Sequence, residues 1–186
     1  MKKHIVLPLP KEDACQLHAG DSVLLSGIVY TARDAAHGRL IDLLHNDQPL
    51  PFDMENAAIY YVGPTPAAEG MPLGSAGPTT SIRCDKYTPE LLDNGLTVMI
   101  GKGKRSEAVK ESICKNKAVY LAATGGAGAL LSRCIKSSEV IAFEDLGTEA
   151  IRKLVIENFP AIVINDCHGN DYYESARTAY LIQNNT

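Results

Sequence analysis

The strongest constraint on the fold is an alternation of short apolar strands and amphipathic helices in the second half of the chain. Strand patterns are expected at residues 97–100, 118–123, 140–143 and 161–166. Helix patterns follow them at residues 106–114, 127–135, 148–158 and 172–183. Four successive strand–helix units predict parallel βα units with covering helices. Right-handed crossovers then place the carboxyl ends of the strands, with their loops, along one edge of the sheet.

The first half of the chain is predicted to be β-rich, with long connections. Strands are expected at residues 23–31 and 57–62, with a helix at residues 33–44 between them. Residues 63–78 are expected to form a loop, because four prolines in this stretch oppose regular structure. The fold class predicted from both halves is therefore α/β.

Size and composition bound the remaining possibilities. The chain has 186 residues, which fits a single domain over residues 1–186. Its net charge of −4 argues against a general nucleic-acid-binding surface. No apolar run reaches the roughly 18 residues typical of a membrane span, and no secretory signal is recognised, so we expect a cytoplasmic protein. The 5 cysteines form no C-x-x-C pair, which predicts free, mostly buried thiols and no metal site in this chain.

Two glycine loops have the composition of nucleotide sites. Residues 101–106 lack the spacing of a phosphate-binding P-loop, although Lys102 and Lys104 in a flexible loop before a helix could hold an anion. The Gly125–Gly128 loop places Gly126 and Gly128 at the first two positions of a dinucleotide-binding pattern, but Leu131 takes the third. An acidic residue at the end of the next strand, Glu144 or Asp145, has the place of a ribose ligand. A dinucleotide-binding protein therefore remains an alternative.

One candidate for chemistry lies where the helix at residues 33–44 begins. Arg33 is expected at the helix N-terminus, where its positive charge opposes the helix dipole. This placement indicates a nearby anion. His37 lies one turn further along the same face, and we expect neighbouring backbone to satisfy its ring.

The most distinctive stretch covers residues 74–85, with the sequence G-S-A-G-P-T-T-S-I-R-C-D. Its small residues allow a ligand to approach the backbone closely. Thr79 and Thr80 follow a rigid proline, and Arg83 comes four residues after Thr79. A hydroxyl beside a guanidinium suits a carboxylate ligand, because arginine binds carboxylates through two parallel hydrogen bonds. An ordinary helix cap with a surface arginine is the alternative.

These runs, in order, resemble a known enzyme family. The order is S-G-x-x-x-T-A-R-D-A-A-H-x-R, G-S-A-G-P-T-T-S-x-R-x-D, M-I-G-K-G-K-R-S and G-G-A-G-A-L-L. Together they are similar to the β subunit of the iron–sulfur (class I) fumarate hydratases and to the related L-tartrate dehydratase β subunits. The resemblance runs from Asp21 to about Tyr173. Residues 102–106 and 142–147 resemble the fumarases more than the tartrate dehydratases.

The resemblance implies a swivelling β/β/α domain and a shared active site. In this family a partner α subunit holds a 4Fe–4S cluster on three cysteines, and the β unit completes the site. The chain is then the β subunit of a hydro-lyase of the TCA cycle, inactive without its partner. The expected assembly is α2β2, with a homodimer as the alternative for the chain alone.

The same motifs imply roles for individual residues. By motif, Arg33, Arg83 and Lys102 bind the carboxylates of a small dicarboxylate substrate, with Thr80 beside them. Thr79 is the proposed catalytic base. Malate and fumarate are the expected substrates, and L-tartrate is the alternative.

Overall fold

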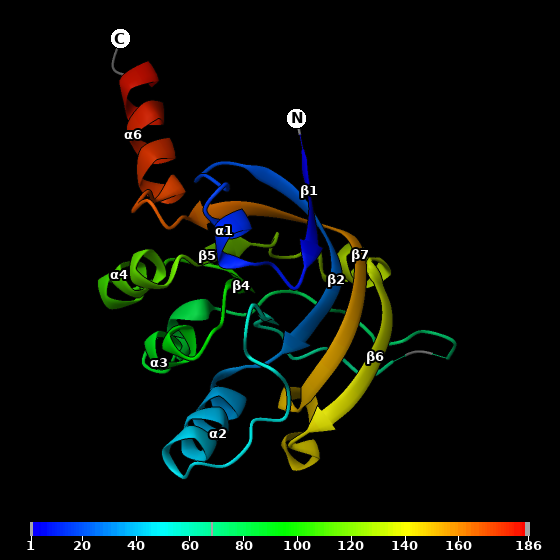
Figure 1. The fold of residues 1–186 in the computed structure, drawn as a ribbon. Helices are drawn as coiled ribbons and strands as arrows, with labels where there is room; N and C mark the ends of the chain where they lie inside the picture. The colour runs from blue at the N-terminus through cyan, green and yellow to red at the C-terminus, as the bar shows by residue number, and fades with distance from the viewer. Residues whose placement is uncertain (1, 68, 185–186) are drawn as a thin grey trace.

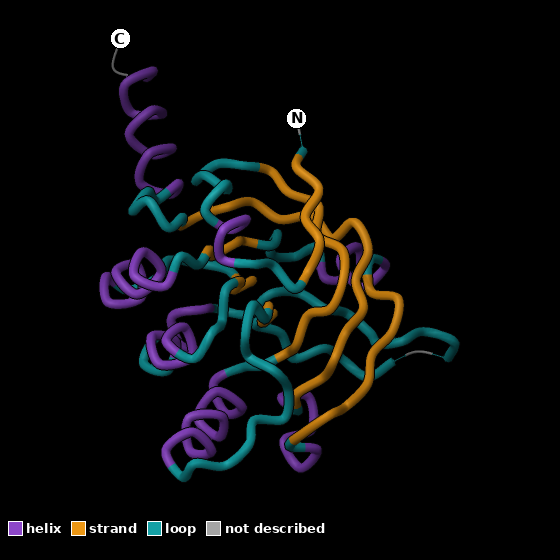
Figure 2. Tube along the Cα trace, in the orientation of Figure 1, coloured by secondary structure: helices purple, strands orange, loops and turns teal. Residues whose placement is uncertain are grey.

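The computed structural model describes residues 2–67 and 69–184 as a mixed α/β structure. Figure 1 shows the arrangement of its elements along the chain, and Figure 2 shows how the long strands curve around one another. The elements, in chain order, are β1 (Lys3–Leu7), α1 (Lys11–Ala14), β2 (Ser22–Thr31), α2 (Asp34–His45), β3 (Ala58–Tyr60), the 3-10 helix η1 (Ser81–Cys84), α3 (Thr88–Asp93), β4 (Val98–Gly101), α4 (Glu107–Asn116), β5 (Val119–Ala122), α5 (Gly128–Arg133), β6 (Ile135–Ala142), the 3-10 helix η2 (Glu144–Glu149), β7 (Ile151–Asn165) and α6 (Tyr172–Asn184).

Five strands close into a ring. β2, β3, β4 and β5 are neighbours and run parallel to one another. β7 then pairs antiparallel with β5 on one side and with β2 on the other, which completes the circle. β1 extends β2 in parallel, and β6 pairs antiparallel with β7. The carboxyl ends of four parallel strands therefore meet at one rim of the ring.

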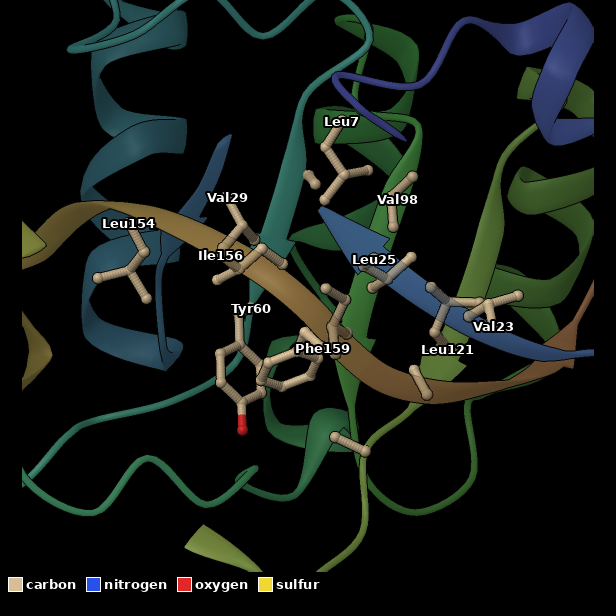
Figure 3. Close-up of a cluster of buried hydrophobic side chains, with 14 of the residues drawn as sticks. Leu7, Val23, Leu25, Val29, Tyr60, Val98, Leu121, Leu154, Ile156 and Phe159 are labelled. Carbon is tan, nitrogen blue, oxygen red and sulfur yellow. The ribbon is translucent and has the colours of Figure 1, made fainter. Parts of the chain in front are cut away.

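The short parallel strands are buried on both faces, so their sequences are almost continuously apolar. Alternate side chains of these strands point into a hydrophobic cluster that the long strands share (Figure 3). In this cluster the ring centroids of Tyr60 and Phe159 lie 5.2 Å apart. The side chains between them, which include Ile59 and Met99, point to the opposite face and belong to a second cluster under the helices. This alternation follows from the two-residue period of a strand.

Helices α2, α3 and α4 lie on one side of the strands, while α6 extends away from the body (Figure 1). The main contacts of α6 in the described part of the chain are with β7. Within residues 2–67 and 69–184, no helix is long and apolar enough to cross a membrane.

Most of the expected elements are confirmed. The strands expected at residues 23–31, 57–62, 97–100 and 118–123 correspond to β2, β3, β4 and β5. The helices expected at residues 33–44, 106–114, 127–135 and 172–183 correspond to α2, α4, α5 and α6. Residues 63–67 and 69–78 contain no helix or strand, as the prolines indicated.

The helix expected at residues 148–158 is wrong, because β7 occupies most of this stretch. A bulge explains the error: residue pairs Leu25–Phe159 and Gly27–Ile156 leave three steps on β7 opposite two on β2. The bulge places buried Ile156 and Phe159 three residues apart, a spacing typical of a helix face. The expectation of successive parallel units is wrong for the same region, since β7 is antiparallel to all its partners.

Candidate functional site

The rim formed by the carboxyl ends of the parallel strands brings three predicted site residues together. Lys102 directly follows β4, and residue Thr80 forms a parallel bridge with it. The backbone N–H of Lys102 also lies 3.3 Å from the carbonyl oxygen of Thr79. Thr79 is fixed to the end of β3, because its backbone N–H and its hydroxyl both donate to the Tyr61 carbonyl at 2.8 Å. Thr79, Thr80 and Lys102 thus share one hydrogen-bonded unit.

Arg83 lies three residues after Thr80 and is exposed to solvent. It lies in η1, which begins directly after Thr80 and packs against α2. The side chain is exposed, and its guanidinium makes no hydrogen bond or ion pair with any described residue. An arginine without a protein partner retains all its donors for an anionic ligand.

Arg33 reaches the same rim from the end of β2, but it is already paired. It is the N-cap residue of α2, and its Nη2 lies 3.1 Å from Glu149 Oε1 and 3.8 Å from Asp34 Oδ1. In the described part of the chain, its buried Nε has no hydrogen-bond partner. A Cβ at Gly63 would lie 3.1 Å from Nη1, so a glycine leaves room for the guanidinium. The position of Arg33 at the helix N-terminus indicated a nearby anion. The carboxylates of Glu149 and Asp34 provide that negative charge.

His37 links Arg33 to the core. Its Nδ1 lies 2.8 Å from the carbonyl oxygen of Arg33, which confirms that neighbouring backbone satisfies one ring nitrogen. Because a carbonyl only accepts, Nδ1 carries the proton and Nε2 is unprotonated. Nε2 is buried without a partner among the described residues. Burial lowers the pKa of His37 to about 4, and the positive charge of Arg105 also lowers it.

A buried arginine, Arg105, connects several elements behind the predicted site. The Arg105 side chain is 0% exposed. Its Nε donates to Asp85 Oδ1 at 2.8 Å, and its Nη2 donates to Thr88 Oγ1 at 2.8 Å. The guanidinium lies 5.3 Å from the ring centroid of Tyr61 and 4.8 Å from that of Tyr120, within cation–π range.

Asp85 joins this buried pair to the start of α4. Its second oxygen accepts the backbone N–H of Ser106 at 2.6 Å, which satisfies a free donor at the helix N-terminus. Ser106 is the N-cap residue of α4, but its own side chain makes no cap hydrogen bond. The signal for this pairing in the sequence is weak, because Asp85 and Arg105 are 20 residues apart.

The hydroxyl groups of Tyr120 and Ser81 form hydrogen bonds that hold the backbone at Lys102 and Gly103. Tyr120 donates to the carbonyl of Gly103 at 2.9 Å, so its single proton is committed there. Ser81, at 2.9 Å from the Tyr120 oxygen, must then donate to it. Ser81 Oγ in turn accepts the backbone N–H of Lys102 at 3.1 Å. A Cβ at Gly101 would lie 2.0 Å from Ser81 Oγ, so this contact requires glycine.

Comparison with known proteins now identifies the family. The chain matches the sequence pattern described as Fumarase C-terminus over residues 2–176. The chain belongs to the fumarase C-terminus family. The resemblance seen in the motifs is thereby confirmed.

Relatives of two lengths share this fumarase C-terminus sequence. Fumarate hydratase 2 of Leishmania major is 38% identical over 165 residues, covering 88% of this chain and 29% of the relative. The aerobic class I fumarate hydratase of Escherichia coli K12 is 39% identical over 152 residues, covering 81% and 28%. A Methanocaldococcus jannaschii protein, provisionally named L(+)-tartrate dehydratase subunit beta, is 38% identical over 172 residues, covering 89% and 88%. The chain thus spans less than a third of these two fumarate hydratases and most of the shorter relative.

The fumarase C-terminus chain has a cavity beside the rim. Its volume is about 370 Å³, and its lining includes Lys102, Thr124, Gly125, Tyr172 and Tyr173. A second cavity of about 410 Å³ lies between the proline-rich loop and the β6–β7 region, and none of the five predicted site residues is in its described lining. The first cavity is therefore the hollow that adjoins the predicted site.

The glycine loop before α5 packs the site rather than forming a dinucleotide fold. A Cβ at Gly128 would lie 2.3 Å from Ser75 Oγ, so this glycine allows the residue 74–78 loop to approach. The dinucleotide hypothesis requires β5 and β6 to be parallel strands of one unit. In the described sheet β6 pairs only with β7, and antiparallel, so that unit is not formed.

The cysteines do not converge on a cluster-binding site. Cys84 is buried, but the other four are partly exposed, so the expectation of mostly buried thiols is wrong. Only Cys15 and Cys167 approach one another among the described thiols, at 3.1 Å between sulfur atoms. Across residues 2–67 and 69–184, no three histidine, cysteine or acidic side chains are grouped to hold a metal. The donor set of this chain therefore does not fit a 4Fe–4S cluster bound by three cysteines.

Proposed function

We propose that this chain is the β subunit of a 4Fe–4S-dependent hydro-lyase that interconverts malate and fumarate. Residues 1–186 would form one fumarase C-terminal-type domain of the swivelling β/β/α kind. The observation that carries the proposal is the joined unit of Thr79, Thr80 and Lys102, which η1 follows directly with the exposed Arg83, an arginine without a partner among the described residues. The cluster belongs to the partner α subunit, since the cysteines of this chain do not fit it, and the complete enzyme is an α2β2 assembly.

The residues of this chain bind and orient the dicarboxylate. Dehydration of malate removes a proton from the carbon next to one carboxylate and hydroxide from the neighbouring carbon, together one water. Arg83 and Lys102 hold that carboxylate, with Thr80 beside them, and stabilise the charge that develops as the C–H bond breaks. Arg33 joins them by exchanging its contact with Glu149 for the substrate carboxylate, which has the same charge.

Thr79 is the proposed base, and for this role its hydroxyl must lose its proton. Its hydroxyl donates to the Tyr61 carbonyl at 2.8 Å, so the resting side chain is neutral. A neutral threonine is a weak base, and proton removal requires its alkoxide. The positive charges of Lys102 and Arg83, which lie in the segments bonded to it, favour that form.

Substitution of Thr79 tests this role. Thr79→Val keeps the shape of the side chain and removes the hydroxyl, so we expect kcat to fall at least 100-fold with KM nearly unchanged. Thr79→Ser restores a hydroxyl and is expected to recover most of the rate. Equal kcat values in the wild type and Thr79→Val would remove Thr79 from the proposed mechanism.

The function itself is tested by reconstitution. The purified chain is combined anaerobically with a cluster-bearing α subunit, and fumarate formation from malate is followed by absorbance. We expect turnover that neither subunit gives alone. Turnover no higher than that of the α subunit by itself would refute the proposal.

L-tartrate is the second candidate substrate. It is favoured by the M. jannaschii relative, whose length this chain nearly matches. Kinetics of the reconstituted enzyme on malate and L-tartrate, measured side by side, distinguish the two. A higher kcat/KM on L-tartrate would replace the malate assignment and leave the carboxylate-binding residues unchanged.

A further inference from the structure

Two cysteines that are distant in sequence, Cys15 and Cys167, lie next to one another in the fold. Cys15 ends α1, and Cys167 follows β7, 152 positions later. Their sulfur atoms lie 3.1 Å apart, and both residues are partly exposed. Formation of a disulfide requires the sulfurs to approach to about 2.05 Å, so a movement of about 1 Å suffices.

The backbone around the two thiols is already held in place. One oxygen of Asp166 accepts the backbone N–H of Ala19 at 2.8 Å, and its other oxygen accepts the backbone N–H groups of His168 and Asn170 at 3.0 Å. The imidazole of His168 lies 2.8 Å from the Cys15 carbonyl oxygen through Nε2. The bonds from Ala19 to Asp166 and from His168 to the Cys15 carbonyl cross between the two segments, so the thiols remain neighbours without a covalent link.

We propose that Cys15 and Cys167 form an oxidation site that closes to an intramolecular disulfide on reaction with low-molecular-weight disulfides. One thiolate attacks a sulfur of the small disulfide, which forms a mixed disulfide and releases one small thiolate. The second protein thiolate attacks the mixed disulfide and releases the other small thiol. The two protein thiols are oxidised, and one small disulfide is reduced to two thiols.

The surroundings of Cys167 favour its thiol form at neutral pH. Burial, then Cys15 and the negative charge of Asp166, raise the pKa of the Cys167 thiol to about 12. His168 cannot take the proton through Nε2, because that nitrogen carries the hydrogen donated to the Cys15 carbonyl. The ring of His18 stacks on His168, with 4.9 Å between the ring centroids, and is a further titratable neighbour. The Cys167 thiolate population, and with it the rate of attack by Cys167, is expected to rise about tenfold per pH unit between pH 7 and 9.

The link would join the N-terminal segment to the base of α6. A Cβ at Gly20 would lie 3.0 Å from the Tyr172 ring, so the first residue of α6 already packs on this segment. Tyr172 and Tyr173 also line the cavity that contains Lys102. Oxidation of the pair therefore fixes one wall of the hollow beside the predicted site. The proposal does not depend on the reaction that the site catalyses.

The experiment measures which thiols react. The full chain is equilibrated with mixtures of reduced and oxidised glutathione at pH 8, quenched with acid, unfolded and alkylated, and the adducts are counted by mass spectrometry. We expect two of the 5 thiols to become protected, and peptide mapping to show a Cys15–Cys167 cross-link. Closure of a loop this long is expected to raise Tm by about 5–15 °C.

Matched variants separate this pair from general thiol oxidation. Cys134→Ser removes another partly exposed cysteine and is expected to leave the cross-link unchanged. Cys167→Ser is expected to abolish it and to leave Cys15 able to form only a glutathione adduct, with the far-ultraviolet spectrum of the wild type. The proposal is overturned if all 5 thiols remain open to alkylation under oxidising conditions, or if the cross-link joins another pair.

Discussion

Replacement of Arg83 removes a positive charge without breaking a hydrogen bond or ion pair among the described residues. Arg83 is exposed and without a described partner, so Arg83→Met is expected to change the free energy of unfolding by less than about 0.5 kcal/mol. A charge-assisted hydrogen bond contributes about 1.5–3 kcal/mol, so kcat/KM of the reconstituted enzyme is expected to fall about 10- to 100-fold. Steady-state kinetics with denaturant unfolding measure both. Arg39→Met, which removes another exposed arginine paired with Asp145, is the control and should retain kcat/KM.

The low pKa of His37 makes stability depend on pH. The folded pKa of about 4 lies below the ordinary 6.5, so the unfolded chain takes up the proton first as the pH falls. The stabilisation is complete above pH 6.5 and is lost between pH 6.5 and 4, to a total of about 3 kcal/mol. Denaturant unfolding of the wild type and His37→Gln across this range should show the steeper loss in the wild type. Parallel curves would contradict the assignment, because the carboxylates titrate alike in both proteins.

At the scale of elements, the Asp85–Arg105 pair joins η1, α3 and the start of α4. Asp85→Ala leaves a fully buried guanidinium without its carboxylate, which typically costs about 3–5 kcal/mol. We expect a loss of stability of this size in denaturant unfolding. The double variant Asp85→Ala with Arg105→Met removes the unpaired charge and should recover part of the loss. A change below about 1 kcal/mol for Asp85→Ala would mean that the pair is not needed to hold these elements.

Elements defined by local patterns could be predicted, whereas those defined by distant pairing could not. The apolar period and the flanking residues were sufficient for α2 and α4, because one face of each helix is buried. The end of β7 was expected as a strand at residues 161–166, but its first part was missed because the bulge imitates a helical spacing and its partners lie far away in sequence. The same distinction applies to the site. Arg33, Thr79 and Lys102 could be proposed because they lie in local motifs. The contact of Glu149 with Arg33 and that of Asp85 with Ser106 join distant residues, so only the folded chain shows them.

At the scale of the whole molecule, ring closure depends on contacts that no local pattern contains. β2 pairs with β7 across more than 120 positions, for example Tyr30 with Lys153. Such pairing fixes the ring only when the whole chain is folded, because the entropy of closing a long loop must be overcome first. The rim that carries the predicted site exists only after this closure. The site is therefore coupled to the global fold, although its motifs are local.

This coupling predicts an uneven pattern of hydrogen exchange. Amides of β7 are bonded to strands on both sides of it, so their exchange should require opening of the ring. α6 has mostly exposed side chains over residues 172–181 and packs substantially only on β7, so it can unfold locally. We expect α6 amides to exchange at least about 100-fold faster than β7 amides, measured by mass spectrometry on peptides and corrected for intrinsic rates. α4, a helix with buried Val109 and Ile113, serves as the control and should be protected. Protection of α6 equal to that of β7 would show that the helix belongs to the same cooperative unit as the ring.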